Sequence, residues 1–325
     1  MDPRAKRWFA AATTLAGDWP LARVLTDKRR SRRRISVVIP ARNEQATIGE
    51  VVSRIRHDVV EAVPLVDELV VMDSLSVDDT ARRARAAGAR VYSVAEVAPE
   101  FGVQAGKGEA LWKSMFVTTG DVVVFIDADL TEWGTHFVTG LVGPLLADDH
   151  VRLVKGYYDR LTDDLPGSTV AAGATAPAPP LEPQGGRVTE LVARPLLALH
   201  WPQLAAVVQP LAGEWAIRRE LFESLSVPIG YGVEFATLLD TVSQHGLEAL
   251  AQVDLGRRAH RHQSVHDLGV MATEILAVAA RRRETTVPEP VELAQYSRED
   301  DGWRTRPVPV RERPPIRDAA RERPA

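Results

Sequence analysis

Short apolar runs alternate with amphipathic stretches between residues 35 and 150. The apolar runs lack polar alternation, which is typical of strands that are covered on both faces of a sheet. They lie at residues 35–40, 67–73, 89–94 and 121–129. A stretch with apolar residues at helical spacing follows the runs, so we predict a doubly wound, mostly parallel α/β sheet.

The pattern is less regular after residue 130. We expect a helix over 136–148 and a strand over 151–159, whereas the composition of 165–186, rich in proline, glycine, alanine and threonine, favours a mobile surface loop. We therefore expect four parts: a helical, basic leader at 1–34, a first α/β half at 35–150, a mostly helical second half at 151–283, and an extended or disordered arm at 284–325.

Composition excludes several classes of protein. The chain has 325 residues, of which 45% are hydrophobic, enough for a large α/β core. Its 40 basic and 44 acidic residues give a net charge of −4, so the overall charge does not indicate a nucleic-acid-binding protein. The absence of cysteine removes disulfides, thiolate metal sites and cysteine nucleophiles. We find no secretory signal and no apolar span of membrane length, and we expect a cytoplasmic protein without a membrane partner.

Two carboxylates follow the run VVVFI at residues 122–126. Asp127 and Asp129 lie one residue apart, at the carboxyl end of a predicted buried strand, where open α/β sheets bind ligands. Carboxylates so placed repel each other unless a cation joins them, which indicates a divalent metal on a pyrophosphate. A solvated turn is the alternative, but the position after a buried strand favours the metal.

Polar groups also follow the first two strands. VVIPARNE places Arg42 and Glu44 after the first strand, and MDSLSVDDT places Ser74 after the second. These groups can bind a base and a ribose, or they can simply cap the following helices. The motifs GxGxxG and GxxxxGK[ST] are absent, which argues against a dinucleotide-binding fold or a P-loop enzyme.

Three further stretches carry candidate chemistry. QAGKGEAL places Lys107 between two glycines before a helix, a pattern that suits phosphate but also an ordinary turn. GGRVTELVARPLL resembles an anion cup, with Arg187 and with Thr189 as the expected N-cap, although a plain capped helix is equally compatible. VDLGRRAHRHQSVHDL supplies histidines 260, 262 and 266, and the residues alone do not select a metal ligand among them.

In this order, VVIPARNE, MDSLSVDDT, GKGEAL and VFIDAD resemble the nucleotide-sugar glycosyltransferases of the GT-A fold, which is Rossmann-like. GGRVTELVARPLL, QPLAGEWAIRRELF, GYGVEFATLLD and AQVDLGRRAHRHQSVHDL are similar to the actinobacterial glucosyl-3-phosphoglycerate synthase family. The resemblance covers residues 35 to 270. DAD stands where close relatives have DSD, and both carboxylates remain.

The resemblance implies an activity. The family transfers glucose from UDP-glucose to the 2-hydroxyl of 3-phosphoglycerate with retention at the anomeric carbon, uses Mg²⁺ or Mn²⁺, and is dimeric. The first half would then bind the nucleotide sugar and the second half the acceptor. This implies UDP-glucose and 3-phosphoglycerate as substrates and a homodimer as the assembly.

The resemblance also implies roles for individual residues. The donor would be held by Pro40, Ala41, Arg42, Glu44, Ser74, Asp127 and Ala128, with Lys107 on the diphosphate. The metal would be bound by Asp129 and His260. The acceptor would be held by Gly186, Arg187, Thr189 and His262, although His262 stands where a relative carries an amide. Glu234 would contact the transferred glucose or the attacking hydroxyl, and the catalytic set would be Lys107, Asp129 and Glu234.

Other functions share parts of this pattern. A metal-dependent nucleotidyltransferase would release pyrophosphate instead of UDP. A mannosyl-3-phosphoglycerate synthase would use another sugar nucleotide, and a transferase with a polyprenyl phosphate acceptor is disfavoured because no membrane helix is expected. A sugar-nucleotide sensor would need no acceptor pocket. For the transfer we prefer a front-face reaction to double displacement, which would need a nucleophile such as Glu234.

Overall fold

The structure is a computed structural model of the chain, and it describes residues 1–161, 186–259, 264–297 and 302–321. The strands are β1 (Thr13–Leu15), β2 (Ile35–Ala41), β3 (Glu68–Asp73), β4 (Arg90–Ser93), β5 (Val122–Phe125), β6 (Leu153–Leu161), β7 (Trp215–Arg218), β8 (Val227–Pro228), β9 (Leu250–Ala259), β10 (Val291–Ser297), β11 (Gly302–Val308) and β12 (Glu312–Arg313). The helices are α1 (Pro3–Ala12), α2 (Leu21–Ser31), α3 (Ile48–Ile55), α4 (Thr80–Ala86), α5 (Lys107–Ser114), α6 (His136–Ala147), α7 (Arg194–His200), α8 (Arg219–Phe222), α9 (Val233–His245), α10 (Val265–Arg281) and α11 (Ile316–Ala319).

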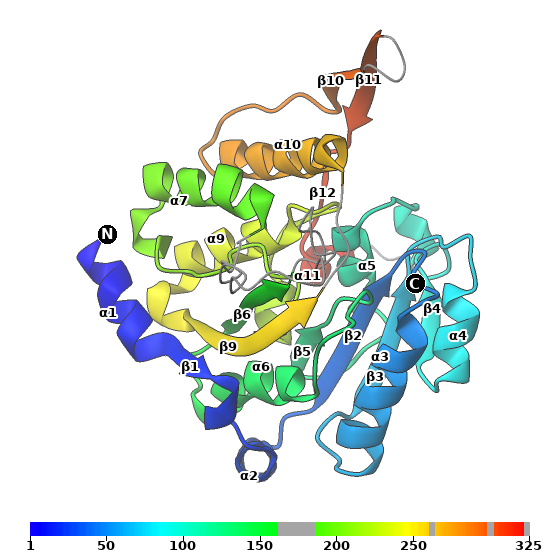
Figure 1. The fold of residues 1–325 in the computed structure, drawn as a ribbon, viewed down its shortest axis with the longest axis vertical. Coiled ribbons are helices and arrows are strands. Elements are labelled where there is room, and N and C mark those ends of the chain that lie inside the picture. The colour runs from blue at the N-terminus through cyan, green and yellow to red at the C-terminus, as the bar shows by residue number, and fades with distance from the viewer. Residues whose placement is uncertain (162–185, 260–263, 298–301, 322–325) are drawn as a thin grey trace, which may run out of the picture.

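A central sheet organises the described residues (Figure 1). Within them it has eight strands in the order β1-β9-β6-β7-β5-β2-β3-β4. β7 is antiparallel to both of its neighbours, β5 and β6, and the other neighbouring strands are parallel. The prediction of a doubly wound, mostly parallel sheet is therefore confirmed, and the carboxyl ends of β2, β3, β5 and β9 share one edge.

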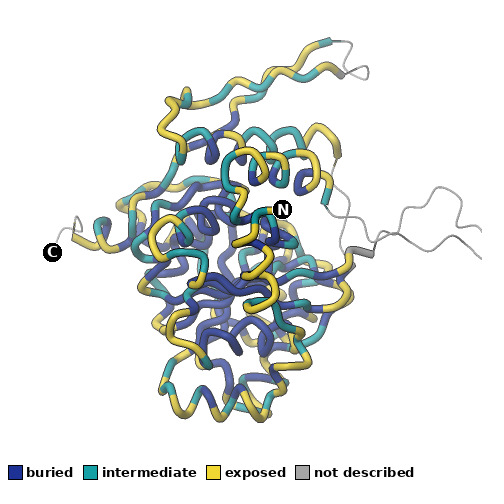
Figure 2. The backbone as a smooth tube through the Cα atoms, turned by 90° about the vertical axis from the view of Figure 1, so that its left-hand side faces the viewer, coloured by how far each residue is buried: buried dark blue, intermediate teal, exposed yellow. Residues whose placement is uncertain are grey.

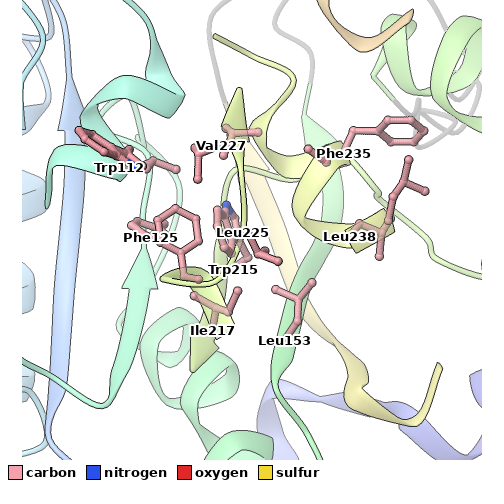
Figure 3. Packing of buried hydrophobic residues seen from close by; sticks show 14 of the residues in the cluster. Trp112, Phe125, Leu153, Trp215, Ile217, Leu225, Val227, Phe235 and Leu238 are labelled. Carbon is pink, nitrogen blue, oxygen red and sulfur yellow. The ribbon is translucent and has the colours of Figure 1, made fainter. Parts of the chain in front are cut away.

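Both faces of the sheet are covered, which explains the missing polar alternation. Along β5, Val122 and Val124 pack into a core with α2, α3, α4 and α6, whereas Val123 and Phe125 pack into the core on the other face, with α5, α9 and α10. Figure 3 shows Phe125 against Trp215 of β7, and their ring centroids lie 4.4 Å apart. The buried strands form the dark layer at the centre of Figure 2.

The second half contributes more strands than we expected. Trp215–Arg218 forms β7 in the middle of the sheet, and Leu250–Ala259 forms β9 beside β6. Four buried residues in a row do not distinguish a strand from a piece of helix. The pairing of Trp215 with Phe125 and Lys155 on the neighbouring strands decides the conformation.

The leader is helical, as expected, but it also joins the sheet. β1 pairs in parallel with β9, and the indole Nε1 of Trp8 donates to Leu250 O at 2.7 Å. Trp8 and Val24 are buried. β1 of this leader therefore closes one edge of the sheet.

We expected an extended or disordered arm at residues 284–325. Its described part is extended but paired: β10 and β11 form an antiparallel hairpin, and β12 pairs with β8 in the body of the protein. The hairpin projects from the rest of the fold next to α10 (Figures 1 and 2). The predicted loop at 165–186 falls outside the described residues except for Gly186.

None of the helices in the described ranges combines the length and the apolar content needed to cross a bilayer.

Candidate active site

A pocket of about 350 Å³ opens at the carboxyl edge of the sheet. Its walls come from the ends of β2, β3 and β5, the start of α5, the turn before α9 and one side chain of α10. The lining residues are Pro40, Ala41, Arg42, Glu44, Ser74, Ala105, Gly106, Lys107, Ala110, Asp127, Ala128, Asp129, Gly230, Tyr231 and Glu274. The residues that the resemblance assigns to the nucleotide sugar therefore lie around one cavity.

Two buried polar atoms at the end of β3 have no hydrogen-bond partner. They are Ser74 Oγ and Asp73 Oδ1. Buried polar groups in folded proteins are almost always paired, so an unpaired atom needs an explanation. Ser74 lines the pocket, and a ligand that carries hydroxyl and amide groups could pair with its hydroxyl.

Lys107, the first residue of α5, links two carboxylates. Its Nζ lies 2.6 Å from Asp127 Oδ1 and 2.7 Å from Glu234 Oε1. Burial by itself would lower the pKa of Lys107, but the two carboxylates outweigh burial and raise this pKa well above its ordinary value. Lys107 is therefore a charged ammonium in the wall of the pocket at every physiological pH.

Arg258, near the end of β9, joins the two predicted carboxylates. Its Nη2 lies 2.8 Å from Asp129 Oδ1 and 3.2 Å from Asp127 Oδ2, and its Nη1 lies 2.9 Å from Glu214 Oε1. Burial opposes the ionisation of Asp127, but Lys107 and Arg258 hold the pKa of Asp127 well below its usual range. Arg258 lies in the stretch VDLGRRAHRHQSVHDL, for which we considered only the histidines, so its contacts with the carboxylates were not predicted.

The arrangement of Asp127 and Asp129 fits a divalent cation. Arg258 Nη2 contacts an oxygen of each carboxylate, so both carboxylates point into the same small volume. Carboxylate oxygens are the ligands that Mg²⁺ and Mn²⁺ prefer. Among the described residues, no group of three or more His, Asp or Glu side chains could hold a metal. Asp129 would therefore need a further ligand, and His260 lies outside the described residues.

The glycines beside Lys107 allow a close approach of two backbone segments. From the residues alone, the pattern suited either a phosphate or an ordinary turn. A Cβ on Gly108 would lie 1.8 Å from Pro228 O, and a Cβ on Gly106 would lie 2.2 Å from Ile229 O. Both glycines therefore allow the start of α5 to pack directly against the backbone that follows β8.

Glu234 and the buried Lys155 lie behind the pocket. Glu234 is 4% exposed in the first turn of α9 and pairs with Lys107. Lys155 of β6 donates to Ala212 O at 2.7 Å, and burial lowers its pKa to about 8. We predicted Glu234 but not Lys155, although a lone lysine within the apolar run VRLVKGYY was a usable signal.

Glu274 of α10 is a further pocket residue that we did not predict. Its carboxylate accepts from the backbone N–H of Tyr231. Burial and the nearby Glu234 raise the pKa of Glu274 to about 7. Nothing in the amphipathic pattern of α10 separates Glu274 from an exposed helical glutamate, because only the packing of α10 over the turn buries it.

The described residues assigned to the acceptor, Gly186, Arg187 and Thr189, are not among those that line this pocket. Helical turns begin at Arg187, so Thr189 lies buried in the first turn and is not the N-cap that we predicted. The carbonyl of Gly186 accepts from Glu190 N–H at 3.0 Å. Because the helix begins three residues earlier than expected, Gly186 occupies the capping region. His262 falls outside the described residues, and His266 is exposed at the start of α10.

Comparison with known proteins places this site in a class. Residues 36–165, which contain β2 to β6 and the two carboxylates, match the family described as glycosyl transferase family 2. The sheet and the pocket at its carboxyl edge are thus those of a nucleotide-sugar glycosyltransferase of the GT-A fold.

The comparison extends over most of the chain. The chain is 48% identical over 291 residues to glucosyl-3-phosphoglycerate synthase of Mycobacterium tuberculosis, covering 88% of this chain and 86% of that protein. It therefore belongs to the glucosyl-3-phosphoglycerate synthase family.

Solved structures of the M. tuberculosis enzyme resemble the fold. The complex with Mn²⁺, UDP-glucose and phosphoglyceric acid has a TM-score of 0.79 and 44% identity, covering 93% of this chain and 95% of that one. The complex with Mn²⁺, UDP and glucosyl-3-phosphoglycerate has a TM-score of 0.80 and 44% identity, covering 93% and 96%.

Proposed function

We propose that this chain transfers glucose from UDP-glucose to the 2-hydroxyl of 3-phosphoglycerate, with retention at the anomeric carbon, and releases UDP. The observation that carries the proposal is the convergence of Lys107, Asp127 and Asp129 on one pocket at the carboxyl edge of the sheet. The family supports the choice of substrates, because the M. tuberculosis relative is described with UDP-glucose, phosphoglyceric acid and the glucosylated product.

The donor occupies the pocket in this proposal. The uridine binds to the backbone of Pro40 and Ala41 and to the side chains of Arg42 and Glu44. A polar group of the nucleoside forms a hydrogen bond with the unpaired hydroxyl of Ser74. Asp127 and Ala128, which are also assigned to the donor, line the same pocket and would face the diphosphate or the ribose.

The chemistry requires stabilisation of the departing UDP. Cleavage of the bond between the glucose C1 and the diphosphate leaves negative charge on the phosphate oxygens. The ammonium of Lys107 is held in place by two carboxylates, where it can stabilise this negative charge. Mg²⁺ or Mn²⁺, held by Asp129 and His260, supplies further positive charge to the diphosphate when it is bound.

Arg258 lies between the carboxylates of Asp127, Asp129 and Glu214 and offsets the repulsion among them. Together with Lys107 it holds the pKa of Asp127 well below its usual range, whereas burial raises the pKa of Glu214. The proposed role of Arg258 is thus to hold Asp127 and Asp129 beside each other.

The acceptor site is assigned to Gly186, Arg187, Thr189 and His262. Arg187 is exposed at the start of its helix, and a guanidinium there suits the phosphate of 3-phosphoglycerate. The attacking hydroxyl would approach glucose beside Glu234. This assignment gives the second half, residues 151–283, the acceptor and the first half, residues 35–150, the donor.

A front-face reaction is the proposed route to retention. In that route the departing phosphate oxygen accepts the proton of the acceptor hydroxyl, on the same face of the sugar. Glu234 is a poor nucleophile in the described geometry, because its Oε1 lies 2.7 Å from the Lys107 ammonium. Isolation of a glucosylated Glu234 after reaction with UDP-glucose alone would replace this route with double displacement.

The decisive experiment supplies the protein with Mg²⁺, 3-phosphoglycerate and a panel of UDP-glucose, GDP-glucose and GDP-mannose. We expect UDP and an α-linked glucosyl-3-phosphoglycerate from UDP-glucose, identified by mass and by the anomeric coupling constant in NMR. Release of pyrophosphate from a nucleoside triphosphate would instead indicate a nucleotidyltransferase. Tight binding of UDP-glucose without turnover would indicate a sensor.

A homodimer in the cytoplasm completes the proposal. On the β10–β11 hairpin, the paired rings of Tyr296 and Trp303 lie 5.6 Å apart and are 51% and 72% exposed. Exposed aromatic residues on a projecting element favour an interface with a second copy. Light scattering of the protein and of Trp303→Ser tests this, and an unchanged dimer would remove the hairpin from the interface.

A chain without cysteine is compatible with a reducing compartment.

A further inference from the structure

The C-terminal segment reaches the wall of the donor pocket. β12 pairs with β8, and the N–H of Ile229 donates to Arg311 O at 3.1 Å. Ile229 is followed directly by Gly230 and Tyr231, which line the pocket. The position of this turn therefore depends on residues that lie about 80 positions later in the chain.

The same turn is bonded to the first turn of α5, which carries Lys107. The N–H of Glu109 donates to Ile229 O at 2.9 Å, and the N–H of Gly108 donates to Gly230 O at 3.2 Å. These bonds use N–H groups that have no partner inside the helix. Two walls of the pocket thus form one hydrogen-bonded unit.

Arg313 of β12 clamps that unit through its side chain. Its Nε lies 2.6 Å from Glu109 Oε2 and its Nη2 lies 2.7 Å from Glu109 Oε1, a bidentate pair between residues that are 8% and 0% exposed. Arg313 Nη1 also donates to Phe101 O at 2.7 Å, and the indole of Trp112 donates to Pro314 O at 2.8 Å. Bidentate guanidinium–carboxylate pairs fix orientation as well as charge.

We propose that residues 311–314 form part of the donor site and that Arg313 is a positioning residue, which fixes Lys107 through Glu109. This inference rests on the proposed function, because it assumes that Lys107 meets the diphosphate. Glu109 and Lys107 share one helical turn, so a displacement of Glu109 moves the ammonium with it. Small errors in the position of a binding group are costly to catalysis.

The test compares Arg313→Met, Arg313→Lys and Glu109→Gln with the matched control Arg317→Met, an exposed arginine four residues further on. Titration calorimetry gives the Kd of UDP in the presence of Mg²⁺, and steady-state kinetics give the KM of each substrate per folded molecule. We expect Arg313→Met and Glu109→Gln to raise the donor KM and the Kd of UDP about tenfold or more. We expect the acceptor KM to stay within about twofold, and Arg313→Lys to recover part of the loss.

A general loss of stability would not raise the donor KM while leaving the acceptor KM unchanged. If Arg313→Met does not fold, Glu109→Gln probes the same link from the other partner with a milder change. A folded variant with the donor KM and UDP affinity of the wild type overturns the inference. The wild-type protein separates this result from the proposed function, because a wild type that binds neither UDP nor UDP-glucose refutes the function itself.

Discussion

Arg258 Nη2 lies 2.8 Å from Asp129 Oδ1, so a buried guanidinium from β9 meets the carboxylate proposed as metal ligand. Arg258 is 5% exposed and also contacts Asp127 and Glu214. Burying several charges is unfavourable unless each has a partner, and here one cation serves three anions. Arg258 is therefore the cation that Asp127, Asp129 and Glu214 share, and Asp127 has Lys107 as a second partner.

Replacing Arg258 with methionine should destabilise the protein strongly. The change leaves the buried Glu214 without this cation, although Asp127 keeps Lys107, and breaking a buried ion pair in this way costs about 3–5 kcal/mol. Urea unfolding at pH 7 measures the effect. Arg257→Met is the matched control, because Arg257 is the exposed neighbour on the same strand. Equal free energies of unfolding for the two variants would contradict the role given to Arg258.

Replacing Asp129 with asparagine should remove metal-dependent turnover and leave the fold intact. Asp129 is partly exposed, and the change keeps its shape but lowers its charge, so we expect Mn²⁺ affinity to fall by about 100-fold or more. Electron paramagnetic resonance of Mn²⁺ reports binding without relying on activity. Glu132→Gln, an exposed carboxylate in the following turn, should bind Mn²⁺ like the wild type. Chelation of the wild type that leaves catalysis unaffected would exclude a metal cofactor.

Replacing Lys107 with methionine should lower kcat more than it changes acceptor binding. The ammonium stabilises charge that develops as UDP departs, and removal of one such preorganised group costs about 10²–10³ in kcat. Steady-state kinetics with UDP-glucose as the varied substrate measure the change. Lys6→Met, at an exposed position of α1, is the control. A kcat of Lys107→Met within a few-fold of the control would show that Lys107 does not contact the diphosphate.

Acid stability should depend on Glu68, far from the pocket at the start of β3. Burial works against ionisation of Glu68, but hydrogen bonds from Ser36 and Thr119 outweigh it and lower the pKa from 4.5 to about 2. A carboxylate with a lowered folded-state pKa stabilises the fold above the unfolded pKa and loses this effect as the pH falls from 4.5 towards 2.

The difference in pKa corresponds to about 3 kcal/mol at neutral pH as an upper bound. We expect Glu68→Gln to be less stable at pH 7 and to lose less stability than the wild type between pH 4.5 and 2. Chemical unfolding across that range measures both. Glu61→Gln, at an exposed glutamate, should follow the wild-type curve. Parallel curves for Glu68→Gln and the wild type would contradict the assignment.

Several features of this protein follow from the sequence by itself. The run at 122–126 predicted a strand covered on both faces, because an apolar stretch without polar alternation is typical of such strands, and Val122–Phe125 form β5 between two layers. Ser74 and Asp127 lie within two residues of the ends of β3 and β5, and Lys107 begins α5. In a parallel sheet such positions meet at one edge. Local pattern and the direction of the strands thus indicated a common edge, and the family resemblance assigned these residues to the donor.

The tertiary structure alone decided which charges meet. Arg258 is brought to Asp129 because β9 lies three places from β5 in the sheet order, and Arg313 is brought to Glu109 because β12 pairs with β8. In the sequence these partners are 129 and 204 residues apart. Pairings of that separation leave no local signal, since they arise from strand order and from the burial of charges that must be neutralised where they are buried.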